Sequence, residues 1–118
     1  MKAYTDITQS KKLAEILPIE SADMTHRWFG KALNVDCYEV SYGRDTINGK
    51  DIPCWSLAAL INILGSKADH VNIGGTGGYW WCRPLFSDIP KYTGSTDGDN
   101  LVDVCVDMII KLKEMNLL

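Results

Sequence analysis

Apolar residues recur at helical spacing in three segments of the chain, and each segment predicts a helix. The first helix is expected over about residues 7–17, where a capping box opens at Asp6. The second is expected over about residues 54–64. Pro53 suits a first helical turn and Gly65 suits a helix end, and between them apolar side chains follow at i, i+3, i+4 and i+7.

The third helix has the strongest pattern and is expected over about residues 100–115. Asp97 and Asp99 precede it, and either carboxylate is a suitable N-cap. Lys111 and Lys113 lie in its closing turns, where positive charge complements the helix dipole. We expect the apolar stripe of this helix to be the centre of the core.

Alternating aromatic and β-branched residues between the first two helices are typical of strands. Two strands are expected, over about residues 25–30 and 35–42, with a bulge at Cys37–Tyr38 where the alternation changes phase. Asn48–Gly49 is a type I′ turn signal, so residues 44–52 are expected to form a small hairpin or a loop.

The stretch NIGGTGGYWW, residues 72–81, combines four glycines with three aromatic residues. It lacks the lysine and the following helix of a phosphate-binding loop, and its glycines do not fit the dinucleotide fingerprint. We expect residues 71–73 and 79–83 to pair as antiparallel strands, with GGTGG as a mobile loop between them. Pro84 is expected to mark an edge where strand pairing ends.

These elements together predict an α+β fold in which a small, mostly antiparallel sheet packs against about three helices as a single pair of layers. No linker or internal repeat divides the sequence, so residues 1–118 are expected to form a single globular domain.

Composition narrows the function classes. The net charge is −3, from 15 acidic and 12 basic residues, and the only adjacent basic pair is Lys11-Lys12, so nucleic acid is not expected as a partner. The first residues lack the apolar run of a signal peptide, and no segment is apolar enough to cross a bilayer. A cytoplasmic location without membrane contact is therefore expected.

The four cysteines lie far apart in the sequence, at positions 37, 54, 82 and 105. Buried free thiols are expected, although a zinc site that combines them with His70 stays open as an alternative. The aspartates around Asp97 and Asp99 do not match a calcium loop. We expect no metal and no cofactor.

Three segments resemble an uncharacterised family of small proteins from gut-anaerobe genomes and their phages and prophages. They read AYTDITQSKKLAEILPIESADM, IPCWSLAALINIL and DVCVDMIIKLKEMNLL, and they cover about half of the chain. The family has no established activity, so no functional residue carries over. The resemblance implies a cytoplasmic accessory protein of mobile-element origin.

One candidate chemistry is a thiol hydrolase with Cys54 as nucleophile. In the first turn of the predicted second helix, its thiolate would be stabilised by the helix dipole. Cys54-Trp55 resembles the dipeptide that opens the nucleophile helix of papain-like hydrolases, and His70 and Asn72 follow as base and orienting amide. The surrounding papain motif is absent, and Cys54 also falls on the apolar stripe, where a packing role is expected.

The leading expectation is a non-enzymatic accessory domain that acts by binding a protein partner or by self-association as a homo-oligomer. Tyr79, Trp80 and Trp81 are the candidate binding residues, because aromatic side chains supply many interface hot spots. Side chains alternate along a strand, so Tyr79 and Trp81 should face one side and Trp80 the other. The alternative is that both tryptophans are core residues.

Overall fold

The computed structural model describes residues 2–43, 49–88 and 94–118. Within this part the chain forms three α-helices, one short 3-10 helix and two three-stranded sheets. In chain order the elements are α1 (Ile7–Ile16), η1 (Ile19–Ser21), β1 (Met24–Ala32), β2 (Val35–Tyr42), β3 (Ile52–Cys54), α2 (Leu57–Lys67), β4 (His70–Thr76), β5 (Tyr79–Leu85), β6 (Thr96–Gly98) and α3 (Leu101–Glu114).

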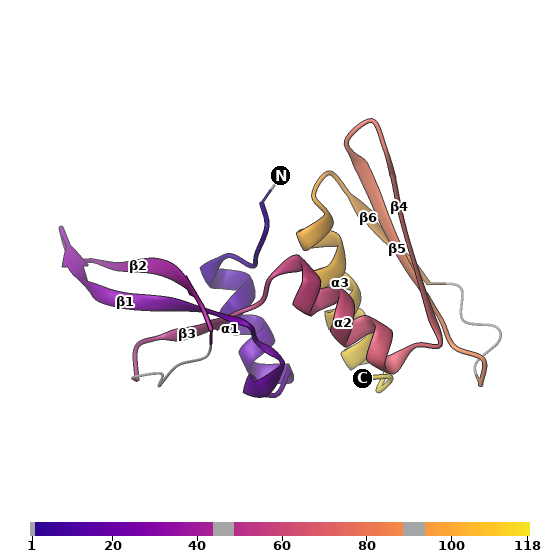
Figure 1. Ribbon diagram of the computed structural model, residues 1–118, viewed down its shortest axis with the longest axis horizontal. Coiled ribbons are helices and arrows are strands. Elements are labelled where there is room, and N and C mark those ends of the chain that lie inside the picture. The colour runs from indigo at the N-terminus through magenta and orange to yellow at the C-terminus, as the bar shows by residue number, and fades with distance from the viewer. Residues whose placement is uncertain (1, 44–48, 89–93) are drawn as a thin grey trace.

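The expected α+β class is confirmed, but the strands form two antiparallel sheets. One has the order β2-β1-β3 and the other β4-β5-β6. The helices lie between the two sheets, with α1 beside the first and α2 and α3 against the second (Figure 1). The sheets are separate because β3 returns to pair with β1, whereas β4 starts a new hairpin after α2.

The first and third helices lie within one residue of their predicted bounds. The Asp6 side chain accepts a hydrogen bond from the Gln9 amide at 2.8 Å, and the Gln9 side chain accepts one from the Asp6 amide, so the predicted capping box is present. The predicted cap of α3 was wrong. Asp97 lies in β6, and the Asn100 side chain, one residue nearer the helix than Asp99, accepts from the Val102 amide at 2.9 Å.

The predicted start and end of the second helix were also wrong. Pro53 and Cys54 belong to β3, and α2 begins at Leu57 after the Ser56 side chain caps the amide of Ala59. Pro53 is tolerated because β3 is an edge strand of its sheet. At the other end the helix continues through Gly65 to Lys67, at a cost in helix propensity of about 1 kcal/mol.

The first hairpin contains the two predicted strands, but its bulge lies in β1 and not at the predicted position in β2. Register shifts between Trp28 and Gly30, opposite the predicted Cys37–Tyr38 position, so the extra residue is Phe29 in β1. Of the hairpin or loop expected over residues 44–52, residues 44–48 lie outside the described residues, and Ile52 belongs to β3.

A contiguous hydrophobic core joins the helices to the inner face of the second sheet. The stripe of α3 supplies its centre, as the periodicity predicts, and Met108 and Leu112 are fully buried there. The buried members of this core are Leu13, Leu17, Ala22, Trp55, Leu60, Ile63, Leu64, Ala68, Cys82, Phe86, Leu101, Val102, Val104, Cys105, Val106, Met108, Ile109 and Leu112.

Candidate functional site

The β4-β5 hairpin confirms the predicted antiparallel pairing and extends it. Residues 70–76 pair with residues 79–85, and only Gly77 and Gly78 form the turn. Their φ angles of 58° and 82° match a two-residue type I′ turn, which requires positive φ at both positions. The expected GGTGG loop was therefore wrong, since its first three residues are part of β4.

The two strand glycines make room for two indole rings on the neighbouring strand. A Cβ atom on Gly74 would lie 2.2 Å from Cζ2 of Trp81, and one on Gly75 would lie 2.4 Å from Cε3 of Trp80. Each tryptophan is also the direct cross-strand partner of the glycine that it covers. The glycines of NIGGTGGYWW thus allow both indoles to lie flat across β4, an arrangement in which aromatic rings compensate for strand glycine.

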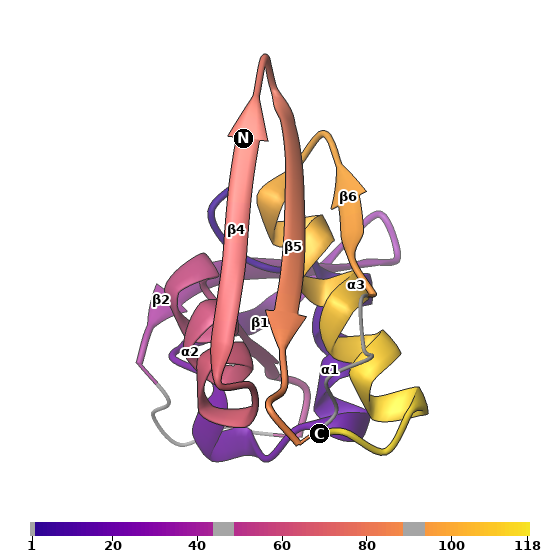
Figure 2. The same ribbon diagram turned by 90° about the vertical axis from the view of Figure 1, so that its right-hand side faces the viewer.

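The aromatic residues alternate between the two faces of the sheet, as predicted. Trp80 faces the helices and packs against the core, so the structure does not bring it together with the other two candidate binding residues. Tyr79 and Trp81 lie on the outer face, with 47% and 38% of their surfaces exposed. This outer face of β4, β5 and β6 is turned to the viewer in Figure 2.

A small hollow lies on this outer face. It has a volume of about 260 Å³ and is lined by Asn72, Trp81, Arg83 and Ser95. Asn72 and Arg83 are cross-strand partners, which brings the amide beside the guanidinium. The hollow therefore combines a flat apolar wall with side chains that donate hydrogen bonds.

Asp97 is the acidic neighbour of this site. It pairs with Trp81 across β5 and β6, so it shares the outer face. The Asp97 carboxylate raises the pKa of the nearby Tyr79 hydroxyl. Arg83 lies two residues further along β5 from Trp81, on the side away from the hairpin turn.

Strand pairing continues past Pro84, which corrects the expected edge. His70 pairs with Leu85, and the Asp69 amide donates to the Leu85 carbonyl at 2.9 Å. Because Leu85 points its polar backbone groups toward β4, Pro84 points away from β4, and β6 pairs only with residues 80–82 on that side. No ladder hydrogen bond is lost where the proline N–H is missing.

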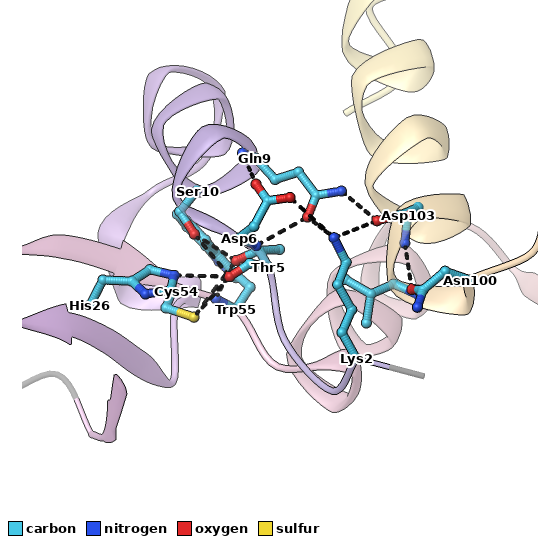
Figure 3. A network of polar contacts seen from close by, with 11 residues as sticks. Lys2, Thr5, Asp6, Gln9, Ser10, His26, Cys54, Trp55, Asn100 and Asp103 are labelled. Carbon is cyan, nitrogen blue, oxygen red and sulfur yellow. Dashed lines mark hydrogen bonds and ion pairs between the residues drawn. The ribbon is translucent and has the colours of Figure 1, made fainter. Parts of the chain in front are cut away.

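Cys54 lies in a different environment from the one the sequence suggests. It is fully buried at the end of β3, and His70 and Asn72 lie in the other sheet. Its neighbour is His26, and both side chains hydrogen-bond to the carbonyl of Thr5 (Figure 3). The His26 Nε2 donates at 2.9 Å, and the Cys54 thiol donates at 3.5 Å.

The Cys54 and His26 side chains are held in their neutral forms. Burial raises the pKa of the Cys54 thiol and lowers the pKa of His26. A nucleophilic cysteine needs the opposite shift of its own pKa and access to substrate. The pair instead fixes the N-terminal segment, where the Trp55 amide also donates to the Thr5 hydroxyl at 3.1 Å.

Two further features of the described residues add no chemistry. In residues 2–43, 49–88 and 94–118, no three side chains among histidine, cysteine, aspartate and glutamate are grouped as metal ligands. A wide groove of about 820 Å³ runs beside η1, the start of β1 and α2, and its acidic members are Glu20 and Asp23. The Asp23 carboxylate accepts hydrogen bonds from the backbone and the hydroxyl of Ser56, so it serves the start of α2.

The sequence pattern missed a second exposed apolar surface, at the tip of the β1-β2 hairpin. Leu33 is 98% exposed, and Phe29 and Val35 are exposed beside it. Leu33 and Asn34 have φ angles of 51° and 63°, a conformation that is costly for a leucine. The available signal was the pair Leu33-Asn34 between two strand patterns, because a two-residue hairpin turn requires positive φ.

Comparison with known proteins gives no relative. No protein-family model, curated protein or solved structure matches the chain. No helix within the described residues is long and apolar enough to cross a membrane. The functional interpretation therefore depends on the geometry of the outer face.

Proposed function

We propose that this protein is a small interaction domain that binds a protein partner through the outer face of β4, β5 and β6. The observation that carries the proposal is Trp81, whose ring is partly exposed and lies flat over Gly74. An aromatic side chain held in one orientation loses little conformational entropy on binding and buries a large apolar area. Tyr79 extends the same exposed face.

The exposed hairpin tip supports the same class of function. Leu33 is presented at the far end of the other sheet, and β1 and β2 project there away from the helices (Figure 1). A fully exposed leucine in a left-handed conformation contributes nothing to the core of its own chain. Self-association through either surface is the alternative form of the proposal, and an accessory role in a phage or prophage is part of it.

Site-specific cross-linking tests the proposed face. A photoreactive phenylalanine analogue at position 79 should give a discrete cross-linked product in cells that contain the partner, and Trp81→Ala should abolish that product. Tyr42 offers a matched control, because it is an exposed tyrosine in the other sheet. The proposal fails if position 79 gives no product, or if the product is insensitive to Trp81→Ala.

The thiol hydrolase is the competing proposal, and no observation favours it. It needs a thiolate at Cys54 that substrate can reach, whereas the side chain is fully buried and its pKa is raised. The contacts of Cys54 and His26 with Thr5 support a structural role for both residues.

A further inference from the structure

We infer that the hollow between Trp81 and Arg83 takes an acidic side chain from an extended segment of the partner, with an apolar residue of that segment on Trp81. This inference rests on the proposed function, which names the face but not the chemistry of the segment. The hollow has a volume of about 260 Å³, below the range of small-molecule sites and sufficient for one side chain.

The charge of the hollow selects a carboxylate. Arg83 is exposed, and no acidic side chain within the described residues forms an ion pair with it. Asn72 and Ser95 line the same hollow and add an amide and a hydroxyl as donors. Asp97 shares this face but lies opposite Trp81 in the strand register, not opposite Arg83. A guanidinium flanked by neutral donors matches the planar acceptor geometry of a carboxylate.

The spacing of the two side chains specifies the form of the partner. Trp81 and Arg83 are two residues apart on one strand, so they face the same side about 6.7 Å apart. Alternate side chains of an extended peptide have the same separation. An extended segment with an apolar residue and an acidic residue at positions i and i+2 therefore contacts both side chains at once.

Nucleic acid fits this face less well. A base could stack on Trp81, but phosphate binding is driven by several cations, and Arg83 is the one arginine or lysine in strands β4, β5 and β6. The net charge of −3 opposes a polyanion further. An acidic peptide needs only one cation, which is what the hollow supplies.

Peptide titration followed by NMR tests the inference. The capped peptide Ser-Leu-Ser-Glu-Ser should shift the Trp81 indole N–H and Arg83 Nε–H signals, with a Kd roughly tenfold lower than that of Ser-Leu-Ser-Gln-Ser. Arg83→Gln should remove this preference. Lys31→Gln should keep it, because Lys31 is an exposed cation in the other sheet.

Three outcomes would overturn the inference. Equal binding of the two peptides would leave the face a peptide site and the proposed function intact, while excluding carboxylate recognition. The absence of any shift at Trp81 would exclude this segment type, and the cross-link at position 79 would then decide the proposed function separately. Tighter binding of a single-stranded oligothymidylate than of the glutamate peptide would replace the acidic peptide with nucleic acid.

Discussion

At the scale of single residues, Gly74 and Gly75 determine where the two indole rings lie. Trp80 packs against the core, whereas Trp81 is partly exposed on the outer face. A methyl group added beneath either ring would come closer than van der Waals contact allows. An alanine at position 75 would therefore displace a ring that packs on the core, whereas an alanine at position 74 would displace a partly exposed ring.

We predict that Gly75→Ala costs about 1 to 3 kcal/mol of unfolding free energy, because Trp80 cannot move without disturbing the core. Gly74→Ala should cost less and should shift the Trp81 indole signal, since that ring can swing toward solvent. Gly65→Ala is the control and should stabilise by up to about 1 kcal/mol, because Gly65 lies within α2 with open space at its Cβ position. Urea denaturation of the three variants measures these differences, and equal costs at 74 and 75 would contradict the assigned faces.

Cysteine reactivity belongs to the same scale. Burial raises the pKa of Cys54, so its thiolate fraction at neutral pH is below that of an ordinary cysteine. We predict that iodoacetamide labels the partly exposed Cys37 first in the native protein, and labels the three buried cysteines slowly. In urea the four rates should converge. Rapid labelling of Cys54 in the native protein, measured by peptide mass spectrometry, would contradict this prediction and support the thiol hydrolase.

At the scale of elements, the apolar face of α3 organises the core. Met108 and Leu112 are fully buried between the other helices and the second sheet. We predict that Met108→Ala and Leu112→Ala each cost about 2 to 5 kcal/mol, whereas Glu114→Ala on the exposed face changes stability by less than about 0.5 kcal/mol. Thermal melts report the result. Parent-like melting of both core variants would mean that the assigned face is wrong.

The sequence predicts those elements whose local signals agree with one another. For α1, periodicity and the capping box point to the same span, and for α3 the apolar periodicity sets the span although its cap was predicted at the wrong residue. Around Pro53 the signals conflict, since proline fits both a first helical turn and an edge strand. The pairing of Ile52, Pro53 and Cys54 with β1 decides the outcome, and this long-range contact has no local signature.

The candidate site was predictable in part for the same reason. Alternation along β5 predicts that Trp81 and Trp80 face opposite sides of the sheet, but only the packing of the helices shows that Trp81 is on the exposed side. The hollow could not be predicted from the sequence, because it depends on the strand register that sets Asn72 opposite Arg83. The role of Gly74 also depends on register, since a glycine under a ring and a glycine in a loop look alike in sequence.

At the scale of the whole molecule, the N-terminal segment joins the two halves. Lys2 Nζ lies 2.6 Å from an oxygen of Asp103 in α3 and 3.2 Å from Asp6 at the start of α1 (Figure 3). Further along, the carbonyl of Thr5 takes hydrogen bonds from His26 and Cys54 in the first sheet. The segment before α1 therefore ties the first sheet to the C-terminal helix.

This connection predicts a pH dependence of stability. Burial lowers the pKa of His26 in the folded chain. As the pH falls below about 6.5, the unfolded chain therefore binds a proton at His26 before the folded chain does. The contribution of neutral His26 to the free energy of unfolding is fully present above that pH. It is lost below that pH, by at most about 1.4 kcal/mol per pH unit. His26→Asn, which keeps a donor for Thr5, should flatten the melting temperature between pH 7 and 5. An unchanged slope would contradict a neutral buried His26.

The central claim is that Trp81 binds a partner while Trp80 stabilises the fold, and paired alanine variants test it most directly. Thermal melts and cross-linking from position 79 should be measured on the same Trp80→Ala and Trp81→Ala proteins. We predict that Trp80→Ala lowers the melting temperature by several degrees, because its ring packs against the core. Trp81→Ala should lower the melting temperature much less than Trp80→Ala does, and it should abolish the cross-link. If Trp81→Ala instead costs several kcal/mol of stability, or leaves the cross-link intact, the exposed indole is not the binding residue.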